Sequence, residues 1–95
     1  MKTIYIADDD NTICELLKAH IKSEGYNVEA FNDGESLYNA FLAMPSDMII
    51  TDIVMPKMTG YDVCREIRKI SLVPIFMISA NNDEVIGDLI ATAFG

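Results

Sequence analysis

Cysteine is scarce in this 95-residue sequence, which contains only Cys14 and Cys64. The two are far apart and lack the spacing of a metal-binding pair, so they indicate neither a disulfide scaffold nor a zinc site. We expect two small apolar helix residues instead. The sequence also lacks internal repeats, linkers and low-complexity segments. We therefore predict a single domain over residues 1–95.

Basic residues are also few, with 7 Lys and Arg against 15 Asp and Glu, which gives a net charge of −8. Nucleic acids and anionic membranes bind positive surfaces, so direct contact with either is disfavoured. A cation or a basic partner surface remains compatible with this charge. No apolar run reaches the ~20 residues of a membrane span, and no charged-then-apolar signal segment opens the chain. We expect a cytoplasmic protein.

Apolar residues make up 51% of the chain, which is enough for a core. Their patterns alternate between strand-like and helix-like segments. Strands are predicted near residues 3–7, 26–31, 48–52 and 72–78, and helices near 11–25, 34–44, 59–70 and 82–93. Strands that alternate with helices through short connections indicate an α/β fold with a parallel sheet and right-handed crossovers.

Helical periodicity also predicts the apolar faces of the helices. Their expected members in the first three helices are Ile13, Leu16, Leu17, His20, Ile21, Leu37, Tyr38, Phe41, Met44, Val63, Ile67 and Ile70. The methionines 44, 48, 55, 58 and 77 are expected to fill the core. Residues 72–78 are almost wholly apolar, which is typical of a strand buried on both faces.

Carboxylates follow two of the predicted strands. Asp8, Asp9 and Asp10 follow the first, and Asp52 ends the third, where Met55-Pro56 prevents the strand from continuing. Gly60 is expected to permit a turn that a residue with a Cβ would resist. In open α/β sheets, ligands bind at the carboxyl ends of the strands.

If the first and third strands are neighbours, these carboxylates converge. Like charges a few ångströms apart repel by ~4 kcal/mol at an effective dielectric of ~20, so the cluster needs an offsetting charge. Mg²⁺ prefers a few carboxylates together with water and phosphate oxygens, and we predict a Mg²⁺ site. The alternative is that Asp8, Asp9 and Asp10 only cap the following helix and favour its dipole.

These motifs together resemble those of a response-regulator receiver domain. The resemblance is carried by Asp8-Asp9 after an apolar strand, by Asp52-Ile-Val-Met-Pro-Lys-Met-Thr-Gly60, and by Ile78-Ser79-Ala80. It covers essentially the whole chain, and the Asp-x-x-Met-Pro-x-Met-x-Gly string is specific. The resemblance implies a flavodoxin-like, doubly wound parallel sheet with strand order 2-1-3-4, with four β-α units of an expected five.

The resemblance also implies the chemistry of the site. Asp52 matches the phosphoacceptor, which takes a phosphoryl group from a sensor histidine kinase or a phosphotransfer protein. Asp9 matches the direct Mg²⁺ ligand, Asp8 a ligand acting through water, and Val54 the residue whose backbone carbonyl completes the metal shell. The expected function is a phosphorylation-activated signalling switch in a phosphorelay, which regulates transcription through an output domain. The domain assists its own phosphorylation rather than acting as an enzyme on other substrates.

Two further matches lie after the fourth strand. Ser79 matches the hydroxyl that moves to hydrogen-bond the phosphoryl oxygen and reports the modified state. Ala80 matches a small residue that leaves access to the acceptor. Asp10 has no comparable role, and capping is its expected function.

The resemblance leaves one part of the family pattern unmatched. Receiver domains carry an invariant lysine at the end of a fifth strand, and none of Lys2, Lys18, Lys22, Lys57 and Lys69 falls at such a place. We expect a fragment of a longer regulator, truncated before the fifth β-α unit. The apolar fourth strand would then form a sheet edge, and exposed apolar edges invite pairing. We therefore predict a fragment that is dimeric, strand-swapped or weakly stable.

Two alternatives remain open. Asp8-x-Asp10-x-Thr12 with Ser79 also fits a haloacid-dehalogenase-like phosphatase, in which Asp8 is the nucleophile and Asp10 the general acid/base. That alternative gives no reason for the string that begins at Asp52. A receiver-like interaction module without phosphorylation is the second alternative, because the lysine is unmatched.

Overall fold

A computed structural model of the chain describes residues 1–78. The elements are β1 (Thr3–Ala7), α1 (Asn11–Ser23), β2 (Asn27–Phe31), α2 (Gly34–Ala43), β3 (Met48–Asp52), α3 (Gly60–Arg68) and β4 (Ile75–Ile78). The strands form one parallel sheet in the order β2-β1-β3-β4. The predicted α/β fold and strand order are confirmed. The fourth predicted helix, Ser79 and Ala80 lie outside the described residues.

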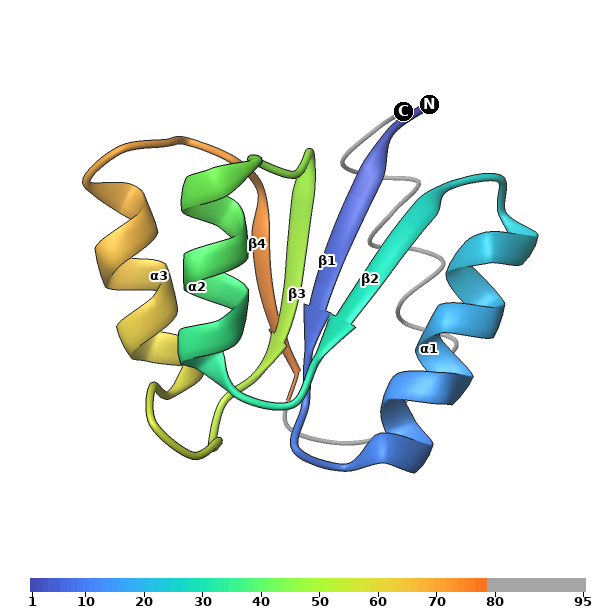
Figure 1. The fold of residues 1–95 in the computed structure, drawn as a ribbon, viewed down its shortest axis with the longest axis horizontal. Helices are drawn as coiled ribbons and strands as arrows, with labels where there is room; N and C mark the ends of the chain where they lie inside the picture. Colours follow the sequence, from blue (N-terminus) through green and yellow to red (C-terminus); the bar gives the residue numbers. More distant parts are fainter. Residues whose placement is uncertain (79–95) are drawn as a thin grey trace.

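Helices cover both faces of the sheet, with α1 on one face and α2 and α3 on the other (Figure 1). Successive side chains of a strand point to opposite faces. Ile4 and Ile6 of β1 therefore pack with Leu17 and Ile21 of α1, whereas Tyr5 and Ala7 join the apolar cluster around α2 and α3. This two-sided burial explains why β1 and β3 are almost continuously apolar.

Short polar motifs start the helices immediately after the strands. The Asp10 carboxylate accepts hydrogen bonds from Thr12 N at 2.9 Å and Ile13 N at 3.4 Å, which caps α1. Asp33 caps α2 by accepting from Ser36 N at 2.7 Å. Thr59 and Asp62 form a capping box at α3. Each cap satisfies backbone N–H groups that a helix leaves unpaired at its start.

Helical periodicity overestimated the buried faces. Leu16 is 43% exposed, Met44 71% and Ile70 58%. Leu16 lies beside the α1 stripe, whose buried members are Cys14, Leu17 and Ile21. Met44 and Ile70 follow the last residues of α2 and α3, so the periodicity of the helix no longer applies to them.

The fourth strand was also predicted too long and too buried. It begins at Ile75, and Leu72 is 89% exposed. Among the described strands β4 pairs only with β3, so its residues are only partly covered and Met77 is exposed. Met48 and Met55 are buried as expected, and Met58 packs partly buried against the core.

No helix within residues 1–78 combines the length and the apolar character needed to cross a membrane.

Candidate functional site

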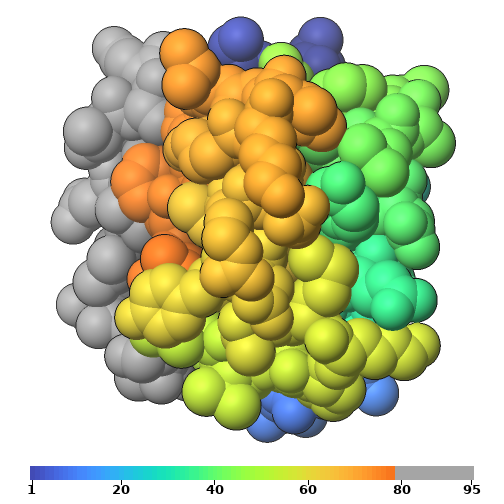
Figure 2. Space-filling model, turned by 90° about the vertical axis from the view of Figure 1, so that its left-hand side faces the viewer, coloured from blue at the N-terminus to red at the C-terminus, as the bar shows by residue number. Residues whose placement is uncertain are grey.

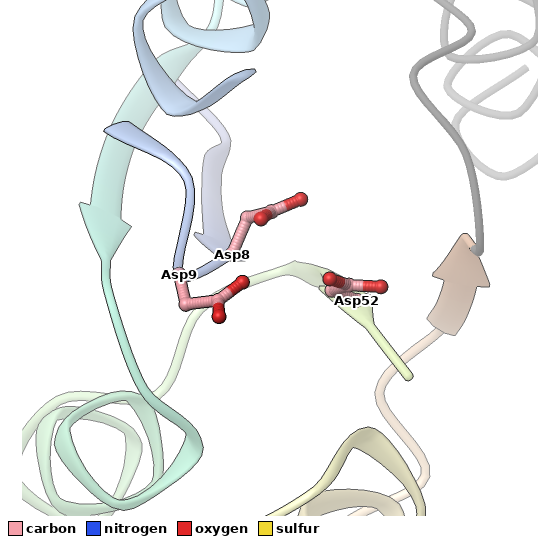
Figure 3. A group of neighbouring side chains, drawn as sticks. All are labelled: Asp8, Asp9 and Asp52. Atoms are coloured by element: carbon pink, nitrogen blue, oxygen red, sulfur yellow. The ribbon is translucent and has the colours of Figure 1, made fainter. Parts of the chain in front are cut away.

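Three carboxylates meet at the carboxyl edge of the sheet. Asp8 and Asp9 directly follow β1, and Asp52 is the last residue of β3. Because β1 and β3 are parallel neighbours in which Ala7 pairs with Thr51, the residues that follow emerge side by side. One oxygen from each carboxylate lies within 4.8 Å of the others (Figure 3). The predicted convergence is confirmed.

Asp8 is the most tightly held member of this cluster, with 5% of its surface exposed. Its Oδ1 accepts a hydrogen bond from Asp10 N at 2.9 Å. Its backbone carbonyl accepts from the Cys14 thiol at 3.3 Å and from Asn32 Nδ2 at 3.4 Å. Sequence reasoning missed these two supporting residues. Cys14 was expected only as an apolar helix residue, and Asn32 directly precedes the Asp33 cap.

The electrostatics of the cluster are unfavourable without a counter-charge. Burial raises the pKa of Asp8, and the nearby charges of Asp52, Asp9 and Asp10 raise it further, against the opposing effect of the Asp10 hydrogen bond. Within residues 1–78, no ion pair involves the three clustered carboxylates. A group of close carboxylate oxygens without a cationic side chain is the donor set that suits Mg²⁺. The residues present therefore fit such an ion.

Asp52 is positioned by the turn that follows it. Its Oδ1 accepts a hydrogen bond from Ile53 N at 2.8 Å, and the Ile53 carbonyl accepts one from Gly60 N at 2.8 Å. The Thr51 hydroxyl donates to the Asp52 carbonyl at 3.0 Å. Asp52 is partly exposed, whereas Asp8 is buried. Of the two, Asp52 is therefore the more accessible to an incoming group.

Gly60 differs from its prediction. It is the first residue of α3, and its φ is not in the left-handed region. A Cβ at this position would instead overlap the carbonyl oxygen of Asp52 and lie 3.2 Å from the Ile53 Cα. The glycine is needed for close approach of two backbones rather than for a special turn conformation.

Val54, Asp10 and Lys57 are not members of the carboxylate cluster. Val54 lies in the loop after β3 with 73% of its surface exposed, and its role as a carbonyl ligand stays a prediction. Asp10 caps α1, as expected. Lys57 lies beside Asp33, with 3.9 Å between its Nζ and the Asp33 Oδ2.

Comparison with known proteins identifies relatives over most of the chain. The chain is 44% identical over 80 residues to a probable transcriptional regulator, ycf27, of Guillardia theta, which covers 84% of this chain and 32% of the relative. It is 35% identical over 82 residues to the DNA-binding response regulator MtrA of Mycolicibacterium smegmatis. That match covers 86% of this chain and 36% of the relative. The chain thus spans about a third of the length of these curated relatives.

Solved structures agree with the sequence matches. A response regulator receiver domain protein from Clostridium thermocellum superimposes with a TM-score of 0.78 at 26% identity, over 100% of this chain and 77% of that one. A complex of histidine kinase ThkA with response regulator protein TrrA matches with a TM-score of 0.76 at 37% identity. That match covers 86% of this chain and 72% of the matched chain. The family model of the response regulator receiver domain matches residues 4–93. With its parallel sheet and acidic cluster, the chain belongs to the response regulator receiver domain family.

Proposed function

We propose that this domain is a phosphorylation-activated signalling switch, in which Asp52 accepts a phosphoryl group from the phosphohistidine of a histidine kinase or phosphotransfer protein. The main observation in support is that one carboxylate oxygen each from Asp8, Asp9 and Asp52 lies within 4.8 Å of the others at the carboxyl edge of the sheet. In the transfer, an Asp52 oxygen forms the new P–O bond and the N–P bond to the donor imidazole breaks. The complex of ThkA with TrrA supports a kinase as partner.

Asp9 and Asp52 would bind Mg²⁺ directly, Asp8 through a water and Val54 through its carbonyl. When bound, the ion supplies positive charge at the acceptor, which lets an anionic carboxylate approach an anionic phosphoryl group. The chain itself orients the nucleophile, since Ile53 N–H holds the Asp52 Oδ1. A phosphoryl group on Asp52 adds charge and acceptor oxygens, to which Ser79 would donate, with Ala80 leaving room.

The output proposed is control of transcription, because the relatives are transcriptional regulators in name. That output would belong to a part of a longer protein, and the domain itself would not contact nucleic acid. A fifth β-α unit with its lysine, and a dimeric or strand-swapped fragment, stay predictions. Sedimentation of residues 1–95 as a well-folded monomer at high concentration would contradict the prediction of a dimeric or strand-swapped fragment.

The test is incubation with acetyl phosphate and Mg²⁺, followed by mass spectrometric location of the phosphoryl group. We expect modification of Asp52 and its loss in Asp52→Asn. Modification of Asp8 would support the phosphatase alternative. Asp8 is the poorer candidate because it is buried, whereas Asp52 is partly exposed. No uptake in a chain extended by the fifth unit would support the interaction module.

A further inference from the structure

The N-terminus of α2 is in close contact with the segment that follows Asp52. We call this segment, residues 53–59, the β3–α3 loop. Gly34, the first residue of α2, is buried, and a Cβ there would overlap the Met58 carbonyl oxygen and lie 2.8 Å from Val63 Cγ2. Figure 2 shows the loop, in yellow-green, against the start of α2, in teal. Only a residue without a side chain permits this approach.

The β3–α3 loop contains an unusual backbone conformation at Lys57. Its φ is 69°, the only positive φ at a non-glycine residue within residues 1–78. Met58 N donates to Pro56 O at 2.8 Å, which closes a tight turn around Lys57. A side chain in this region costs free energy, so the turn persists only where its surroundings hold it. The Lys57 ammonium lies 3.9 Å from the carboxylate of Asp33, the cap of α2.

The same loop determines the orientation of Asp52. Its first residue, Ile53, donates a hydrogen bond to Asp52 Oδ1, and the Ile53 carbonyl accepts one from Gly60 at the start of α3. Ile53 is therefore the residue through which the loop contacts the Asp52 carboxylate. The contacts made by α2 lie outside the carboxylate cluster, on the same loop that contacts one of its members.

We propose that Asp33 and Gly34 of α2, together with Lys57, are positioning residues that hold the β3–α3 loop so that Ile53 orients Asp52 toward Asp8 and Asp9. The consequence for Mg²⁺ rests on the proposed function, whereas the orientation itself requires neither metal nor phosphate. The steric contact at Gly34 contributes more than the ion pair, because the Lys57 side chain is 58% exposed and exposed pairs are weak.

Gly34→Ala tests the steric contact. We expect the ¹⁵N–¹H resonance of Ile53 to move in the metal-free protein, because the added methyl displaces the Met58 carbonyl. Titration with Mg²⁺ alone should give a dissociation constant about tenfold higher, as for other residues that support metal ligands. Lys69→Gln is the matched control, since it removes an exposed ion pair with Glu66 at the far end of α3. A folded Gly34→Ala protein with an unchanged Ile53 resonance and unchanged affinity would overturn the proposal.

Asp33→Asn and Lys57→Gln test the ion pair and decide the matter if Gly34→Ala does not fold. Asparagine caps a helix as well as aspartate does, so Asp33→Asn removes the charge and keeps the cap. Each variant should move the Ile53 resonance in the same direction and weaken Mg²⁺ binding by up to about fivefold. The double variant should equal either single one, because both remove the same contact. Additive effects, or a stationary Ile53 resonance, would contradict the positioning role.

The Ile53 resonance is measured in the metal-free protein, so it tests the positioning role independently of the proposed function. A wild-type protein that binds no Mg²⁺ would contradict the metal site. The response of Ile53 to the three substitutions would still confirm or overturn the role of α2.

Discussion

Asp8 is the residue at which the carboxylate cluster most clearly reduces the stability of the fold. Its carboxylate is buried beside two others, and burial raises its pKa above the usual value. The native state therefore binds a proton more readily than the unfolded chain does. By linkage, the free energy of unfolding falls as pH rises from the usual Asp value to the raised one. Above the raised pKa, and without a metal, the charge of Asp8 therefore destabilises the protein.

Asp8→Asn should therefore stabilise the metal-free protein at pH 7 by about 1 to 3 kcal/mol, the repulsion of unit charges ~5 Å apart at dielectrics between 80 and 20. Asparagine keeps an oxygen for the Asp10 N–H. The gain should vanish at about pH 3 and below, where Asp8 is protonated in both states. Urea unfolding in EDTA at both pH values measures this. An equal gain at both would contradict the electrostatic origin.

Asp9 and Asp10 are neighbours with separate roles. Asp10 caps α1, whereas Asp9 belongs to the carboxylate cluster. Asp9→Asn should weaken Mg²⁺ binding by about tenfold or more, since even residues that only support a metal ligand have effects of that size. Asp10→Asn should leave affinity and stability nearly unchanged, and Asp10→Ala should cost about 1 kcal/mol of stability. Calorimetric titration and urea unfolding distinguish the two residues, and a loss of affinity in Asp10→Asn would place Asp10 in the metal site.

At the scale of the elements, the start of α3 is fitted directly against the end of β3. The capping box of Thr59 and Asp62 fixes where the helix begins. Gly60 then brings its backbone against Asp52 and donates to the Ile53 carbonyl. The α3 helix and the β3 strand are thus joined by backbone contacts, which cannot adjust by changing a rotamer.

Gly60→Ala should destabilise the protein by about 1 to 3 kcal/mol, because the methyl group meets backbone rather than a flexible side chain. The better helix propensity of alanine, worth about 1 kcal/mol, offsets only part of this. Gly25→Ala is the control, because its Cβ would meet open space but its φ is 90°. Both should be less stable by urea unfolding, and only Gly60→Ala should move the Ile53 resonance. A neutral Gly60→Ala would show that the two backbones can separate freely.

At the scale of the whole molecule, the excess of acidic residues acts in two ways. The net charge of −8 makes the compact state self-repelling, which any salt screens. The carboxylate cluster concentrates part of that charge at one edge of the sheet. A divalent cation bound there should therefore stabilise the domain beyond simple screening.

Added NaCl should raise the free energy of unfolding modestly, and MgCl₂ at the same ionic strength should raise it more. A ligand at 100 times its dissociation constant contributes about 2.7 kcal/mol when it binds only the native state. Thermal unfolding in the two salts measures the excess. Asp9→Asn and Asp52→Asn should remove the excess and keep the response to NaCl. Equal effects of the two salts on the wild-type protein would contradict a specific site.

The sequence alone was enough to predict the alternation of strands and helices, the cap at Asp10, the strand order through a resemblance, and the convergence of Asp8, Asp9 and Asp52 that this order implies. The alternation and the cap follow from local patterns, and the convergence follows from the strand order together with the rule that parallel strands end at one edge. Four features became known only from the three-dimensional arrangement: the exposure of Leu16, the partial burial of β4, the support of Asp8 by Cys14 and Asn32, and the contact of Gly34 with Met58. Those features depend on which distant backbones pack together, and a local pattern does not specify that.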